Sequence, residues 1–176
     1  MLVDFLHEHT QIRLQLVPGY PDYHPEHPGG MPQGGGTLEP GLVSLAGIPE
    51  WVDRIAGEPR RVVLVEMPLG GGTGVVAPDV LAERESSQLE GMGRALVAGL
   101  LEACLVHGVQ VTTGSRAVRL LTESGAVTGV QLETADSVRS VAAGAVVLAT
   151  GGFEYDFDLV RDFLRGPLTR GVGVLT

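Results

Sequence analysis

The stretch VVLATGGFEYD at residues 146–156 decides the fold, because five residues typical of a buried strand run directly into two glycines. We predict a buried strand over residues 146–150 that ends at Gly151 and Gly152. Glycine lacks a Cβ atom, so this pair lets another group come very close to the backbone. From these residues alone, a plain strand-to-helix turn explains the glycines equally well.

The segments before this stretch favour a bound ligand over a plain turn. They predict a helix over residues 93–108, with Gly108 as its C-cap, followed by strands over 109–113, 116–123 and 127–134. The helix is apolar on nearly every side, so we expect it to be covered on more than one face. Open α/β sheets bind ligands outside the carboxyl ends of their strands, and the glycine pair follows such an end.

The rest of the chain is assigned from the same periodicities and from clusters of glycine and proline. We expect helices over 2–9, 50–57 and about 157–164, strands over 12–17 and 60–67, and loops over 18–41 and 68–78. The acids Glu154, Asp156 and Asp158 favour the start of the last helix through its dipole.

Composition limits the class of protein. Among the 176 residues, 44% are hydrophobic, which is enough for a core. A net charge of −9 without a basic stripe argues against nucleic acid as a partner. The single cysteine, Cys104, rules out an internal disulfide and suits the cytoplasm, and its apolar surroundings predict an inert core thiol. We expect neither a signal peptide nor a membrane span.

Two regions carry a resemblance to a known family. Residues 93–156 contain a Gly-Arg-Ala-Leu helix, Gly-Val-x-Val, a meander and Ala-Thr-Gly-Gly-Phe, and residues 20–40 contain YPDYHPEHPGG. In this order they resemble the flavoprotein subunits of fumarate reductase and succinate dehydrogenase, with the nearest likeness to 3-ketosteroid Δ1-dehydrogenases. An inserted meander is a known plan among such dinucleotide-binding flavoproteins.

The resemblance implies FAD as cofactor and a set of residues that contact it. The glycines of the strand end would leave room for the dinucleotide, and backbone groups of the strand at 116–123 would read the adenine. The implied cofactor-binding residues are Ala117, Val118, Ala149, Thr150, Gly151 and Gly152.

The same resemblance implies a catalytic role for Tyr23. The tyrosine of the Pro-Asp-Tyr loop lies in the active site of the ketosteroid branch and assists removal of the substrate proton. A tyrosine hydroxyl has an ordinary pKa of about 10, so it needs help from its surroundings near neutral pH. Without the resemblance, a tyrosine among prolines and glycines is simply an exposed loop residue.

The sequence also departs from the family pattern. It contains no Gly-x-Gly-x-x-Gly turn for the pyrophosphate, and GGGTG at residues 70–74 has the wrong spacing and is followed by Pro78 instead of a helix. We read GGGTG as a flexible loop. Gly35-Gly36-Thr37 stands where the family usually has Gly-Arg-Ser, so an anchoring arginine is missing.

The expected fold is therefore α/β (mixed α+β), part of a Rossmann-like FAD-binding domain with an inserted β-meander that lacks the first βαβ unit. We expect residues 1–92 to carry the active-site loop of this domain. Residues 93–156 carry its helix, meander and Ala-Thr-Gly-Gly strand, and residues 157–176 begin a substrate domain. The chain reads as an internal fragment, and one face of the 93–107 helix should be uncovered, which predicts poor solubility.

Other polar residues have two readings. His24 with His27, and His7 with His9, suggest a metal, but neither pair has further ligands at metal spacing, so we expect surface histidines and no metal. Arg94 either contacts substrate or cofactor or is a surface arginine near a helix start.

The function that follows is an FAD-dependent oxidoreductase that removes two hydrogens from adjacent carbons. Its substrate would be a small molecule, either a steroid-like ketone or a dicarboxylate-like acid. The alternative is a non-catalytic module that contacts FAD or a nucleotide, or an inactive remnant. We expect the isolated chain to hold FAD weakly or not at all.

Overall fold

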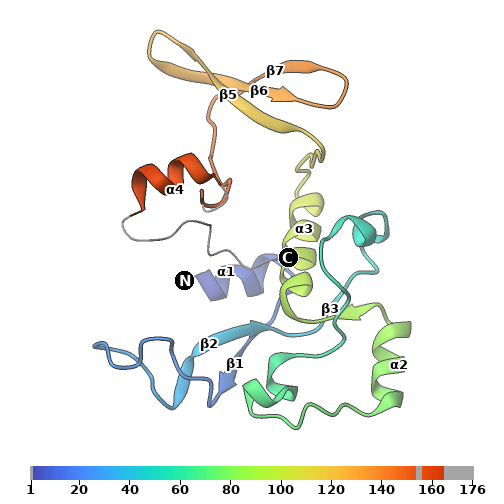
Figure 1. Ribbon diagram of the computed structural model, residues 1–176. Coiled ribbons are helices and arrows are strands. Elements are labelled where there is room, and N and C mark those ends of the chain that lie inside the picture. Colours follow the sequence, from blue (N-terminus) through green and yellow to red (C-terminus); the bar gives the residue numbers. More distant parts are fainter. Residues whose placement is uncertain (1, 154–155, 165–176) are drawn as a thin grey trace. The chain divides into compact units, whose positions relative to one another are not determined.

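The computed structural model describes residues 2–153 and 156–164 (Figure 1). The chain divides into two compact units, Met1–Gln110 and Val111–Thr176, and each is described by itself. Most of the expected substrate-domain segment at 157–176 lies outside the described residues, as does the predicted helix-favouring acid Glu154.

The first unit combines short helices with two small antiparallel sheets. β1 pairs with β2, and β3 pairs with β4. In chain order its elements are α1 (Leu2–His9), β1 (Leu14–Pro18), β2 (Gly34–Pro40), β3 (Val43–Ser44), the 3₁₀ helices Pro49–Arg54, Leu64–Glu66 and Pro68–Gly70, α2 (Pro78–Ser86), β4 (Leu89–Glu90) and α3 (Met92–Val106).

The core of this unit lies along one face of α3. Ala95 and Ala98 of that helix are fully buried, and their small side chains let larger side chains from earlier in the chain approach closely. The apolar partners in this cluster are Ile12, Val43, Leu45, Ile48 and Ile55.

Other faces of α3 are not covered within the described residues. Val97 and Val106 are exposed. The expectation that this helix is covered on more than one face is wrong, whereas the prediction of an uncovered apolar face is confirmed. Cys104 is also exposed, not a core thiol, and lines an apolar groove of about 430 Å³ with residues of α1 such as Phe5.

The second unit contains the predicted meander. β5 (Arg116–Glu123), β6 (Ala126–Glu133) and β7 (Val138–Ala142) form one antiparallel sheet in the order β5-β6-β7, drawn in yellow to orange in Figure 1. Ser124 and Gly125 join the first two strands with φ angles of 49° and 83°, as a tight type I′ hairpin turn requires. β5 and β6 match the sequence-based assignments to within one residue.

α4 (Phe157–Phe163) confirms the last predicted helix. It begins at an N-cap, because the Asp156 carboxylate accepts hydrogen bonds from the backbone N–H groups of Asp158 and Leu159, both at 3.1 Å. Capping by an acidic side chain satisfies donors that have no partner inside the helix.

Three predicted strands do not form. Residues 109–113 and 146–150 have no strand partner, and residues 60–67 contain the 3₁₀ helix Leu64–Glu66 instead. At 60–67 the backbone is satisfied in other ways, because the buried Glu39 carboxylate accepts from the N–H groups of Leu64 and Val65. Buried backbone N–H and C=O groups need hydrogen-bond partners, but side chains can supply them in place of a neighbouring strand.

Two segments read as loops contain regular structure. β2 runs through Gly34-Gly35-Gly36, where the chain of β1 comes so close that a Cβ on Gly34 would lie 2.6 Å from the backbone nitrogen of Gly19. Glycine here serves close approach rather than flexibility. Pro78, taken as a sign that no helix follows, is instead in the first turn of α2, where its missing N–H costs nothing.

Candidate functional site

Gly151 and Gly152 are exposed and lie in a segment after β7 that has neither helix nor strand. The predicted burial of the strand before them is wrong, since Val147 is 89% exposed and Leu148 is 65% exposed. A strand of a parallel sheet needs partners on its edges, and the described residues provide none here. Gly151 has a φ of +79°, which favours glycine, and a Cβ built on it would meet no atom within 4 Å.

Ala149 and Thr150 share this exposure, so backbone and side chains of residues 149–152 are open to a bound molecule. Open space beside the backbone is found at Gly151, and the contact of the glycine pair with FAD stays a prediction.

Ala117 and Val118 lie on β5, which is an edge strand of the meander. Ala117 pairs with Leu132 and Arg119 with Gln131, so the register shifts at Val118. At a bulge of this kind the extra residue is left out of the ladder, and an edge strand carries N–H and C=O groups without strand partners on its outer side. These open backbone groups are the ones that the expected contact of Ala117 and Val118 with adenine would use, and that contact stays a prediction.

Tyr23 lies in the loop between β1 and β2 of the first unit and is 88% exposed. Its hydroxyl is 3.3 Å from that of Tyr20, and the two rings meet edge-on with their centroids 6.4 Å apart. The hydrogen bond to Tyr23 raises the pKa of Tyr20 above its ordinary value. Tyr20 is a residue that the sequence did not single out, although its i, i+3 spacing from Tyr23 in a tight loop was a usable signal.

The glycine turn at residues 70–74 is not a phosphate cradle. The N–H groups of Gly72 and Gly74 donate to the carbonyls of Met67 and Glu66, at 2.9 and 2.8 Å. Gly70 and Gly71 likewise donate to backbone carbonyls. Because these donors are already used, the turn is a folded structural element and not a flexible loop or an anion site.

Comparison with known proteins places this architecture in a flavoprotein family. The FAD binding domain family matches residues 3–170. The chain belongs to this family, whose cofactor is FAD, and the resemblance drawn from the sequence is confirmed.

Individual relatives point the same way. The chain is 33% identical to 4-oxocyclohexanecarboxylate 2-dehydrogenase of Sinomonas cyclohexanicum over 95% of its own length and 30% of that protein. It is 30% identical to 3-oxosteroid 1-dehydrogenase of Mycobacterium tuberculosis over 96% of its length and 34% of that protein. The chain therefore spans about a third of the length of these relatives.

A solved structure supports the fold. The crystal structure of 3-ketosteroid delta1-dehydrogenase from Sterolibacterium denitrificans, in complex with 1,4-androstadiene-3,17-dione, matches with a TM-score of 0.71 at 24% identity. The match covers 94% of this chain and 34% of that one. The fold class, part of an α/β FAD-binding domain with a β-meander, is thereby confirmed.

The residues present fit part of FAD. The β5 edge and the open segment at 149–152 provide polar backbone groups and space, which suit the adenosine portion. The glycine turn at 70–74 does not suit the pyrophosphate portion, because its N–H groups at Gly70, Gly71, Gly72 and Gly74 already donate to backbone carbonyls. Across residues 2–153 and 156–164, no helix is long and apolar enough to cross a bilayer.

Proposed function

We propose that this chain contributes cofactor-contacting and proton-handling residues to an FAD-dependent dehydrogenase that removes two hydrogens from adjacent carbons beside a ketone. The observation that carries the proposal is the family match over residues 3–170. The names of the relatives add that both substrates are oxo compounds, one a cyclohexane carboxylate and the other a steroid. A ring ketone is therefore the proposed substrate class, in preference to a dicarboxylate.

Tyr23 is the proposed proton-handling residue. Tyr20 is protonated at neutral pH, and its raised pKa is caused by the hydrogen bond to Tyr23. With Tyr20 as donor, the Tyr23 oxygen gains stabilisation whenever it carries negative charge. Tyr23 can thus help to move the proton from the carbon next to the ketone, while bound FAD supplies the hydride acceptor.

The proposed FAD contacts divide between two segments of the second unit. Ala117 and Val118 would offer edge-strand backbone groups to the adenine, and residues 149–152 would lie along the dinucleotide. A cytoplasmic location belongs to the same proposal, since Cys104 is a free, exposed thiol, and such thiols persist in reducing compartments.

The second candidate function is a non-catalytic module that contacts FAD or another nucleotide. The exposure of residues 147–150 and the occupied backbone donors of the glycine turn at 70–74 favour it. The two functions differ in whether the FAD-loaded chain removes hydrogens from the carbons beside a ketone.

Binding of FAD by the purified chain is the first test, followed by flavin fluorescence and thermal shift. We expect weak, saturable binding that is lost in Gly152→Trp, because the indole fills the space beside the backbone. Gly144→Trp is the matched control, since Gly144 is an exposed glycine of the same unit with open space around it. A folded chain that binds no FAD at millimolar concentration would overturn the proposal.

Turnover is the second test, with FAD-saturated chain, an electron-accepting dye, and either 4-oxocyclohexanecarboxylate or a 3-oxosteroid as substrate. If the chain turns over either ketone, we expect Tyr23→Phe to lower kcat by about 10²- to 10⁴-fold, the usual contribution of a positioned acid or base. Tyr20→Phe should lower it less. FAD binding without turnover of either ketone would instead support the non-catalytic module.

A further inference from the structure

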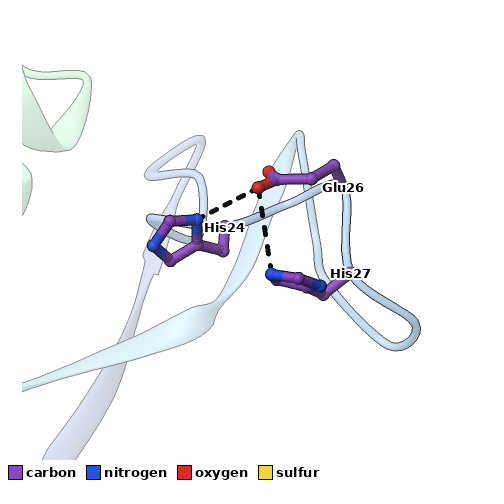
Figure 2. A group of neighbouring side chains, drawn as sticks. All are labelled: His24, Glu26 and His27. Carbon is purple, nitrogen blue, oxygen red and sulfur yellow. Dashed lines mark hydrogen bonds and ion pairs between the residues drawn. The ribbon is translucent and has the colours of Figure 1, made fainter.

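Three side chains with metal-binding atoms face one another on the loop between β1 and β2. Figure 2 shows the Glu26 carboxylate with one oxygen directed at the rings of His24 and His27. The His24 Nδ1 is 3.0 Å from Glu26 Oε1, and the His27 Nε2 is 4.0 Å from the same oxygen. The three ligand atoms all lie within 4.8 Å of one another.

These separations are close to those of a tetrahedral metal centre. Ligand atoms at about 2.0–2.1 Å from Zn²⁺ are about 3.3 Å apart in tetrahedral geometry. The 3.0 Å separation is close to this spacing, and the 4.0 Å separation needs a shift of under about 1 Å. The separation between the His24 and His27 nitrogens is at most 4.8 Å, so it needs a shift of at most about 1.5 Å. All three side chains are exposed, so rotation of their side-chain torsions can supply such a shift.

The loop that carries them is constrained by its own backbone. The N–H of His27 donates to the carbonyl of His24 at 3.2 Å, and the N–H of Gly30 donates to the carbonyl of His27 at 2.8 Å. Pro25 and Pro28 fix φ on either side of the Glu26-His27 pair. The ligands are thus partly ordered before a metal arrives, which lowers the entropic cost of binding.

We propose that His24, Glu26 and His27 bind one divalent transition-metal ion of the Zn²⁺ type. Two imidazoles and one carboxylate suit Zn²⁺, Cu²⁺ or Ni²⁺, whereas Mg²⁺ and Ca²⁺ prefer sites made of oxygen atoms. Three protein ligands leave a fourth position for water or a ligand atom of a bound molecule. The sequence argued against a metal because the histidines were considered as pairs, and Glu26 between them is the ligand that was missed.

The proposal is tested by calorimetric titration of the chelator-treated chain with Zn²⁺, and by the visible absorption of bound Co²⁺. We expect one ion per chain, with no competition from excess Mg²⁺. The variants His24→Gln/His27→Gln and Glu26→Gln should each lose about tenfold or more in affinity. Replacing a residue that only supports a metal ligand typically lowers metal affinity about 10- to 100-fold. Replacing a ligand itself should therefore lower the affinity at least as much.

The matched control is His9→Gln/His107→Gln, which also removes two histidines from the first unit. Their ring centroids are 6.3 Å apart, so they test whether any neighbouring histidine pair gives the same signal. We expect this variant to bind Zn²⁺ as the parent does. Equal binding by His24→Gln/His27→Gln and parent, or a loss confined to the control variant, would overturn the proposal. Since all the changed loop side chains are exposed, circular dichroism should be unchanged.

Discussion

The guanidinium of Arg94 donates through Nε to Glu90 Oε2 at 2.6 Å, and both side chains are only 8% exposed. Arg94 also donates to the carbonyl oxygens of Val52, Ile55 and Gly57. The guanidinium of Arg94 donates to groups of this chain and is buried. Both earlier interpretations, a contact with substrate or cofactor and a surface arginine, are therefore replaced by a structural role. Arg94 instead links the segment at 52–57 to the start of α3 through these hydrogen bonds.

Removal of this guanidinium should be costly. We expect Arg94→Met to lower the free energy of unfolding by about 3–5 kcal/mol, because the Glu90 carboxylate is left buried without its partner. Urea unfolding followed by circular dichroism measures the change. The double variant Arg94→Met/Glu90→Leu should recover much of the loss, and a double variant as unstable as the single one would contradict this account.

The helix glycines give a second prediction. A Cβ on Gly99 would lie 2.5 Å from Cγ1 of the fully buried Ile12. We therefore expect Gly99→Ala to cost about 1–3 kcal/mol through overpacking. A Cβ on Gly93, in the same helix, meets nothing within 4 Å, so Gly93→Ala should gain up to about 1 kcal/mol from helix propensity. Thermal unfolding compares the two, and equal effects would contradict the packing argument.

A third prediction concerns acid stability. Arg84 holds Glu66 through two hydrogen bonds of 2.7 and 2.9 Å, and this pairing lowers the pKa of Glu66. A lowered folded-state pKa gives stability that is fully present above the ordinary value of about 4.3 and is lost as pH falls through the folded-state value. Glu66→Gln should therefore cost about 1 kcal/mol at neutral pH and almost nothing at strongly acidic pH.

Thermal unfolding of parent and Glu66→Gln across acidic and neutral pH checks this. Glu85→Gln is the control, because Glu85 is more exposed in its ion pair with Arg61 than Glu66 is in its pair with Arg84. We expect its unfolding temperature to follow the parent at every pH. A Glu66→Gln deficit that persists at strongly acidic pH would show that the carboxylate charge is not the cause.

What the sequence predicted well is local. The meander depends on alternating side chains and on the Ser124-Gly125 turn, and α4 depends on its Asp156 cap, all within a few residues of one another. What it predicted badly depends on partners far along the chain. An apolar run such as 146–150 becomes a strand only beside other strands. β2 was missed because a glycine run resembles a loop until its neighbour is known.

The candidate site shows the same division. Ala117 and Val118 could be placed on an edge strand because the meander itself was predictable. The pairing of Tyr20 with Tyr23, and of Glu26 with two histidines, depends on how the loop folds back on itself. Spacing in the sequence suggests such clusters, but the distances between hydroxyl, carboxylate and imidazole atoms come only from the fold.

The tyrosine pair gives a final prediction by titration. The hydrogen bond to Tyr23 stabilises protonated Tyr20 and raises its pKa above the ordinary value of about 10. Tyr23→Phe removes the partner oxygen, so Tyr20 should titrate at lower pH in this variant than in the parent. Tyrosinate absorbance measures the shift in a Tyr155→Phe background, which leaves only these two of the three tyrosines.

His24→Gln is the matched control for this titration, since it changes the residue next to Tyr23 and leaves both hydroxyls in place. We expect its Tyr20 pKa to equal that of the parent. If Tyr23→Phe leaves the Tyr20 titration unchanged, the two hydroxyls are not hydrogen-bonded in solution. Tyr23 then lacks the donor that would stabilise its negative charge, and its proposed role in moving a substrate proton loses its physical support.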